Sequence, residues 1–296
     1  MLKTYFLDAL DHYHFFTLTM MFTLTISQVT CLSDKDLKEV PIAKYPYVAL
    51  LSIRRTTGAT GKCSGVLIAA NSILTAASCL YNVLPKKVVA YTGVTDRSKF
   101  TQEAGVQERP SKYLVYHPGY CPLKKCNGTL SGYNLGVVRT KKPFQLTSYC
   151  QFARLQYTWI DYSNFTVAMV GWYFTHHETS EQKWSLLHRL RTQVLADSEV
   201  CNLLPSHAIC IHQKDHEHLI GEAGSPLIYK GRVIGVRGYR TLSMNKSILT
   251  YENVFMFRHW IQCAWLRCDA NFYRRNRSVA LNLLQFFLLS YYWFDL

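Results

Sequence analysis

Between residues 40 and 250 the apolar residues come in short runs that are rich in β-branched and aromatic side chains. Gly, Pro, Asn and Asp separate these runs, as they separate strands in β proteins. Representative runs are Tyr47–Ile53, Lys87–Tyr91, Phe165–Val170 and Arg232–Val236. Many short strands joined by frequent turns predict an all-β sandwich or barrel. Hydrophobic residues make up 49% of the chain, which argues against a disordered protein.

One late segment departs from the strand pattern. Asn253–Leu266 carries apolar residues at helical spacing, so we expect a helix there near the end of the domain. The sequence contains no internal repeat and no low-complexity tract. These features favour one β domain that ends in a helix.

The cysteines and glycosylation sequons indicate a secreted protein. The chain has 10 cysteines and no Cys-x-x-Cys pair, which favours disulfides over a zinc site. His212, His216 and His218 lie together, but we interpret them as a solvated loop and predict no metal and no cofactor. Four Asn-x-Ser/Thr sequons point to the same compartment. The acceptor residues are Asn127, Asn164, Asn245 and Asn276.

The N-terminal and C-terminal segments differ in composition from the β-rich middle of the chain. Residues 1–31 are predicted to be an export segment, because Phe15–Ile26 is apolar and too short to span a bilayer. Its start carries Asp8 and Asp11 against Lys3 and so lacks the usual positive charge, and translation from Met20 or Met21 would explain this. Residues 269–296 form a basic and then apolar extension. It either lies in a membrane interface or packs against the domain.

The charge balance limits the chemical class of binding partner. Lys plus Arg number 33 and Asp plus Glu 19, a formal net charge of +14. This excess favours anionic lipid, an acidic glycan or an acidic protein face, unless it is simply a soluble basic surface. No nucleic-acid-binding motif is present, so nucleic acid is not expected as a partner.

Three ordered segments carry a family resemblance. Cys63–Ile68 with Leu74–Cys79, then Tyr133–Val138, then Gly221–Leu227 resemble the CGGSLI…LTAAHC, DIALL and GDSGGPL motifs of the chymotrypsin/trypsin-like serine proteases. The resemblance implies two antiparallel Greek-key β-barrels with a C-terminal α-helix, over a domain of residues 32–268.

The same resemblance places the catalytic triad on residues that cannot perform its chemistry. The histidine position holds Ser78, the aspartate position Asn134 and the nucleophile position Ala223. The family mechanism needs a nucleophile, a base and an orienting carboxylate. Gly221 is retained at the oxyanion-hole position. Ser225 is the one candidate for a replacement nucleophile, and no base stands beside it in sequence.

Two further family features are altered. Family members are activated by a cleavage that frees an N-terminus to pair with the acid of GDSGGPL. Here the acid is Glu222, and the segment before the domain contains no such terminus. The former specificity pocket maps to Glu217, Gly238 and Arg240. Arg240 is expected to fill this pocket or to pair with Glu217.

The resemblance also implies disulfides. It pairs Cys63 with Cys79 and Cys201 with Cys210. Cys121 with Cys126 and Cys150 with Cys263 are further candidates, and Cys31 and Cys268, which are then left over, are a last candidate pair. Sequence alone does not fix these last connectivities.

These observations predict a secreted, catalytically inactive serine protease homologue. It would bind an extracellular protein partner, namely a protease, a protease inhibitor or a substrate-like segment, as a decoy or regulator. One alternative is a membrane- or surface-associated adaptor that uses the C-terminal extension. The other is a residual serine-type endopeptidase.

Overall fold

The computed structural model describes residues 37–55, 58–122, 133–174, 185–195, 208–212, 220–243 and 246–266. All of them belong to the unit Leu37–Leu296. The predicted export segment and C-terminal extension lie outside the described residues. Within the described part of the chain, no helix is long and apolar enough to cross a bilayer.

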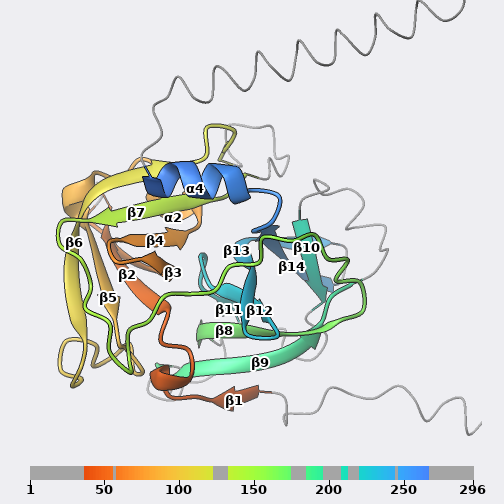
Figure 1. Cartoon of the computed structure of the whole chain (residues 1–296), viewed down its shortest axis with the longest axis horizontal. Coiled ribbons are helices and arrows are strands. Elements are labelled where there is room, and N and C mark those ends of the chain that lie inside the picture. Colours follow the sequence, from red (N-terminus) through yellow and green to blue (C-terminus); the bar gives the residue numbers. More distant parts are fainter. Residues whose placement is uncertain are drawn as a thin grey trace, which may run out of the picture. The chain divides into compact units, whose positions relative to one another are not determined.

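Six antiparallel strands close into the first barrel, in the order β2-β3-β4-β7-β6-β5 (Figure 1). Strand β2 pairs on one side with β3, with Leu50 opposite Ser64, and on the other with β5, with Leu50 opposite Tyr91. Closure leaves no exposed strand edge. The strands are β2 Val48–Arg54, β3 Thr60–Ala69, β4 Ser72–Thr75, β5 Val88–Thr92, β6 Gln107–Tyr116 and β7 Gly136–Thr140.

The second sheet has the order β1-β9-β8-β12-β13-β14-β10, and β11 pairs with β8. An isolated bridge between Val194 and Ile211 brings its far strand near β9, so the sheet curls into a half-barrel. The strands are β1 Leu37–Glu39, β8 Thr166–Phe174, β9 Leu187–Gln193, β10 Ala208–His212, β11 Ile220–Gly221, β12 Pro226–Tyr229, β13 Arg232–Ser243 and β14 Lys246–Asn253.

The helices within the described residues are short. They are the 3-10 helices η2 Ile42–Lys44 and η3 Pro85–Lys87 and the α-helices α2 Ala77–Leu80 and α4 Arg258–Leu266. The terminal helix α4 lies along β7 (Figure 1). It begins later than the predicted Asn253, because β14 continues to that residue. The Asn253 Oδ1 then accepts a 3.0 Å hydrogen bond from the backbone N–H of Phe255 in the following turn.

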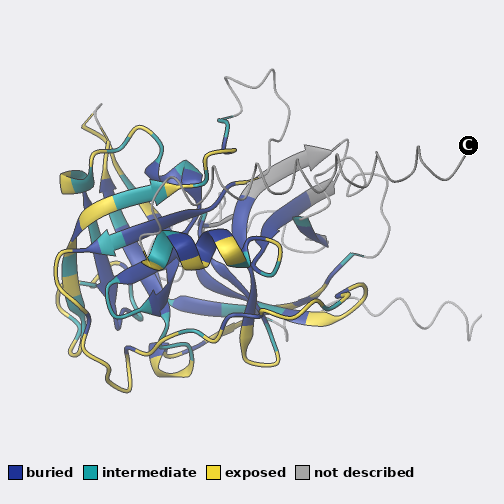
Figure 2. Ribbon diagram, turned by 45° about the horizontal axis from the view of Figure 1, so that its top comes forward, coloured by how far each residue is buried: buried dark blue, intermediate teal, exposed yellow. Residues whose placement is uncertain are grey.

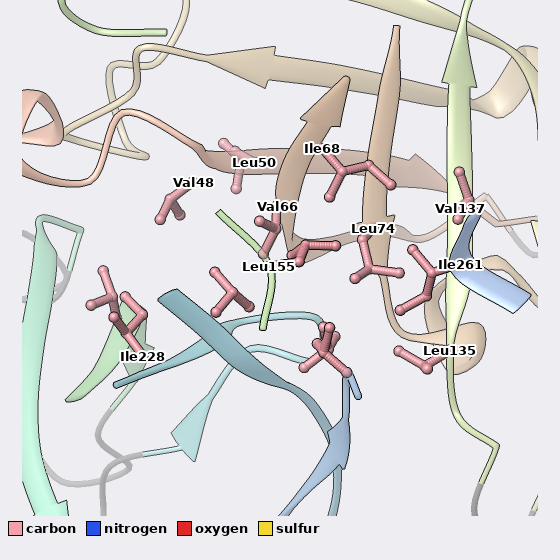
Figure 3. Packing of buried hydrophobic residues seen from close by; sticks show 14 of the residues in the cluster. Val48, Leu50, Val66, Ile68, Leu74, Leu135, Val137, Leu155, Ile228 and Ile261 are labelled. Carbon is pink, nitrogen blue, oxygen red and sulfur yellow. The ribbon is translucent and has the colours of Figure 1, made fainter. Parts of the chain in front are cut away.

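One hydrophobic cluster joins the barrel, the second sheet and α4 (Figure 3). It brings together Val66 and Val137 from the barrel, Ile228 from the second sheet and Ile261 from α4. Each of these side chains is buried. Figure 2 shows the buried stretches of the strands in dark blue. Burial of such a side chain contributes about 1.5–3 kcal/mol. The predicted fold class, a mostly β protein with two barrel-like sheets and a C-terminal helix, is confirmed.

Candidate functional site

Three connections between strands bring together the residues that the resemblance assigns to the triad. Ser78 lies on α2, which follows β4 after a short turn. Asn134 stands just before β7, after Tyr133, whose φ of 56° turns the chain. Ala223 lies in the turn between β11 and β12. The first two positions come from the barrel and the third from the second sheet.

Ser78 and Asn134 are in direct contact. The Ser78 backbone N–H donates to Asn134 Oδ1 at 2.8 Å, and Asn134 Nδ2 donates to Ser78 Oγ at 3.4 Å. The Asn134 side chain is fully buried, so its amide oxygen and its amide nitrogen both require hydrogen-bond partners. An amide does not titrate near neutral pH, and a hydroxyl is not a general base there. This contact therefore joins two of the positions that the resemblance assigns to the triad, and it does so with uncharged groups.

The Ala223 turn is fixed against β3. The Ser64 backbone N–H donates to the Ala223 carbonyl at 2.9 Å, and the next residue, Gly224, has φ 89°. A Cβ at Gly224 would lie 2.0 Å from the Ser64 carbonyl oxygen, so only glycine fits. Ser225 is buried, and its Oγ donates to the Glu222 carbonyl at 2.7 Å. The Ser225 hydroxyl is thus used in holding the turn.

Glu222, next to Ala223, forms a buried ion pair with Arg97. Arg97 lies in the loop that follows β5, and its Nη1 is 2.6 Å from Glu222 Oε1. Ser64 Oγ donates to the other carboxylate oxygen at 3.1 Å. Burial raises the pKa of Glu222, while the Arg97 guanidinium and the Ser64 hydroxyl oppose that rise. The Arg97 side chain therefore holds Glu222, the acid of the third motif, in place.

A second buried carboxyl lies beneath Asn134. Glu252 on β14 accepts a 3.1 Å hydrogen bond from the Asn134 backbone N–H through Oε1. Burial raises the pKa of Glu252 to about 7, although hydrogen bonds from the backbone N–H groups of Asn134 and Tyr133 favour the carboxylate and lower it. Gly238 on β13 faces both groups, since a Cβ there would lie 3.5 Å from Glu252 Oε1 and 3.6 Å from Asn134 Nδ2.

Tyrosine rings gather beside Ser78 and Asn134. Tyr81, directly after α2, packs edge-on against Tyr116 at 5.8 Å and against Tyr120 at 5.7 Å. Tyr133, next to Asn134, stacks on His117 at 4.8 Å. Tyr116 and Tyr133 are exposed. We refer to Tyr81, Tyr116, Tyr120 and Tyr133 as the tyrosine cluster.

The remaining predicted site residues are only partly described. Gly221, the oxyanion-hole position, is in β11, opposite Tyr173 of β8. Gly238 is buried next to Asn134, as stated above. Arg240 lies in β13, but its side chain is not among those described, and Glu217 lies outside the described residues. The predicted filling of the former pocket by Arg240 therefore stays a prediction.

One disulfide prediction is confirmed and one is wrong. Cys63 and Cys79 are joined. Cys150 is a free, buried thiol, so it does not pair with Cys263, which is itself disulfide-bonded. The pairing fails because Cys150 packs in the barrel core with the Cys63–Cys79 bridge, whereas Cys263 lies on α4.

Two other cysteines are disulfide-bonded, namely Cys121 and Cys210. Their predicted partners, Cys126 and Cys201, lie outside the described residues, as do Cys31 and Cys268. The sequons at Asn127, Asn245 and Asn276 are also outside. Asn164 is described and exposed in a turn. In the part of the chain that the structure describes, no group of His, Cys, Asp or Glu could hold a metal ion.

Sequence reasoning missed Arg97 and Glu252. Arg97 lies in a loop whose sequence, Thr-Asp-Arg-Ser-Lys, carries no recognisable motif. Glu252 occupies a strand position where a charged residue is normally exposed. Both gain their roles from contacts across more than 100 residues, to Glu222 and to Asn134.

Comparison with known proteins agrees with this geometry. The Trypsin family model matches residues 36–261. The fold is similar to that of the scabies mite inactivated protease paralogue S-I1, with a TM-score of 0.65 and 16% identity over 78% of this chain and 99% of that one. It is also similar to the scabies mite inactivated protease paralogue S-D1, with a TM-score of 0.59 and 18% identity over 77% of this chain and 95% of that one.

At these identities the two solved structures support the fold alone. The family assignment rests on the match of the Trypsin model, which spans most of the chain. The three motif segments lie within the matched residues, and the structure brings them to one site. The chain belongs to the trypsin family.

Proposed function

We propose that this chain is a secreted, non-catalytic member of the trypsin family that binds a protein partner over the former catalytic site. The observation that carries the proposal is the hydrogen-bonded pair of Ser78 and Asn134. A hydroxyl, Ser78, occupies the place of the base, an amide, Asn134, occupies that of its orienting acid, and Ala223 offers a methyl group in place of a nucleophile. No covalent acyl-enzyme route is available to these three residues.

The residual endopeptidase alternative is weakened by the same site. Its candidate nucleophile, Ser225, is buried and donates its hydroxyl to a backbone carbonyl. A reactive serine needs an accessible Oγ and a neighbouring base. Secretion is supported by the Cys63–Cys79 disulfide, since such bonds persist in oxidising compartments. The two scabies mite proteins of similar fold are named as inactivated protease paralogues, which fits the proposal.

The tyrosine cluster supports a protein partner at this place. Tyrosine is enriched at the energetic centres of protein interfaces, because it buries a large rigid ring and keeps a polar tip. Tyr116 and Tyr133 are 39% and 38% exposed beside the former triad, and packing against Tyr81 and His117 orders their rings. A protease, an inhibitor or a substrate-like segment would meet these rings first.

A fluorophosphonate probe tests the loss of catalysis. The secreted chain and active trypsin are incubated with the probe, and labelling is mapped by mass spectrometry. We expect label on trypsin and none on any serine of this chain. Covalent labelling of Ser78 or Ser225 would refute the proposal.

Partner binding is tested separately, with a photo-crosslinker placed at Tyr116 and, as a matched control, at Phe152, which is 40% exposed on the connector after β7. The proposal expects a protease, an inhibitor or another secreted protein to be captured from Tyr116 and not from Phe152. Equal capture from both positions would remove the former catalytic site as the binding surface.

A further inference from the structure

A groove lies away from the triad positions, between the connector that precedes β8 and the hairpin that joins β12 to β13. The connector runs beside β13, because Gln156 N–H donates to the Val233 carbonyl at 3.0 Å and Val233 N–H donates to the Arg154 carbonyl at 2.8 Å. The groove has a volume of about 350 Å³. Its polar and aromatic lining consists of Gln156, Tyr157, Thr158, Tyr229, Lys230 and Arg232.

The charge of this groove is positive. Lys230 and Arg232 line it and are exposed, and none of its described lining residues is acidic. The nearby Asp161 is engaged within its own turn, where Ser163 donates to it from its backbone N–H at 2.9 Å and from its Oγ at 2.7 Å. Two cations without a facing carboxylate favour an anionic occupant.

Two tyrosine rings form the other part of the groove. Tyr229 is held by stacking on Phe165 at 5.2 Å and by an edge contact with Tyr162 at 5.8 Å. Lys230 Nζ lies 5.2 Å from the centre of the Tyr229 ring, which places the cation next to the aromatic surface. Burial raises the pKa of Tyr157, so its hydroxyl stays protonated and able to donate.

The combination selects one class of ligand. The volume is at the lower end of small-molecule sites, about 300–1,000 Å³, which suits one or two sugar rings better than a folded protein surface. Aromatic faces are weakly negative and attract the polarised C–H face of a sugar ring, while ammonium and guanidinium groups bind sulfate or carboxylate. The chain's net charge of +14 adds long-range attraction for a polyanion.

We propose that this groove binds an acidic oligosaccharide, with its anionic groups on Lys230 and Arg232 and a sugar ring against Tyr157 and Tyr229. The proposal goes beyond the proposed function and does not depend on it, because none of the groove residues belongs to the triad positions or to the tyrosine cluster. Sulfated and carboxylated sugars share the required chemistry, and the experiment separates them.

The test measures binding of the full-length secreted chain by isothermal titration calorimetry. The probes are a heparin hexasaccharide, its desulfated form and a hyaluronan hexasaccharide, which carries carboxylates only. The double variant Lys230→Ala/Arg232→Ala should lower heparin affinity about tenfold or more, since two charge-assisted contacts are lost. Tyr157→Ala should lower it several-fold with an unchanged salt dependence, since no charge is removed.

The matched control is Lys141→Ala/Lys142→Ala, which removes the same charge from an exposed turn after β7. The control should bind heparin like the unmodified chain. An equal loss in both double variants would overturn the proposal, because binding would then follow total charge. Displacement of heparin by poly-glutamate at equal charge concentration would also overturn it in favour of an acidic protein. Binding of both hyaluronan and desulfated heparin, which carry carboxylates and no sulfate, would leave the site standing and assign it to carboxylated sugars.

Discussion

Arg97 Nη1 lies 2.6 Å from Glu222 Oε1, and both side chains are buried. The two residues are 125 positions apart in sequence, and their contact joins the loop after β5 to the turn that carries Ala223. In the resembled proteases the corresponding acid pairs with an N-terminus freed by cleavage. Here the Arg97 side chain, from within the chain, pairs with the acid and helps to hold the turn.

We predict that Arg97→Met destabilises the domain by about 3–5 kcal/mol, because an uncompensated buried carboxylate remains. The double variant Arg97→Met/Glu222→Gln should recover much of this loss, since it removes the orphaned charge. Urea unfolding curves of both variants provide the measurement, with the exposed Arg54→Met as control. A single variant as stable as the parent would contradict a structural role for the pair.

Glu252 should make stability fall as the pH rises. Its pKa is raised to about 7 in the fold and is near 4.3 in an unfolded chain, so folding favours the protonated form. The stability that the protonated Glu252 contributes is complete below about pH 4 and is lost as the pH rises to about 7, a change of roughly 3–4 kcal/mol. Glu252→Gln should remove this slope in denaturation midpoints measured from pH 4 to pH 8. The prediction fails if the variant keeps the same pH dependence.

Asn134→Asp should be unfavourable, although it restores the family residue. The new carboxylate would lose the amide donor to Ser78 and would lie beside the buried Glu252. Like charges at short range raise the pKa of one group, so the variant should lose about 1–3 kcal/mol at pH 8 and less at pH 5. Thermal unfolding at the two pH values tests this against Asn82→Asp, an exposed turn position. Equal stability of the two variants at pH 8 would count against it.

Cys150 should be unreactive in the folded chain. It is fully buried, and burial raises the pKa of its thiol, so little thiolate is exposed for alkylation. Iodoacetamide without reductant should leave its peptide unlabelled in buffer and label it in guanidinium chloride. Cys79 serves as internal control, because its disulfide blocks labelling in both conditions. Labelling of Cys150 in native buffer would show that the barrel core opens there.

Asn164 should carry a glycan when the chain passes through a secretory pathway. It is exposed in a turn with φ 61°, and Thr166 completes an intact sequon. Peptide mass spectrometry after glycosidase treatment should find Asn164 converted to Asp. The variant Thr166→Ala should lose that conversion and no other. An unmodified Asn164 in the secreted protein would refute the prediction.

Much of the fold was predictable from short-range sequence features. The β-rich runs and their turn residues gave the strands, as at Lys87–Tyr91, which contains most of β5. The boundary of the terminal helix was missed, because apolar residues at helical spacing begin at Val254, in the turn between β14 and α4. Periodicity cannot separate a buried strand end from the first helical turn.

The candidate site was likewise predictable from the sequence only in part. The identities of Ser78, Asn134 and Ala223 were readable from the motifs, because each motif is local and its residues hold fixed places within it. The resemblance implied that these residues lie together, and the structure shows the hydrogen bonds between Ser78 and Asn134. The Cys150 pairing was wrong because disulfide connectivity depends on distances across the fold, which sequence order does not contain.

The sequence by itself determined that the chain forms β strands and that it resembles the trypsin-like proteases, and the resemblance assigns Ser78, Asn134 and Ala223 to the triad positions. Only the tertiary structure decided which charged residues are buried, among them Arg97 with Glu222, and Glu252 beneath Asn134. It also decided that Tyr157 and Lys230 share one groove. The physical reason is that strand formation and chemical identity are local properties. Burial and charge pairing depend on which distant segments the barrel and the second sheet bring together.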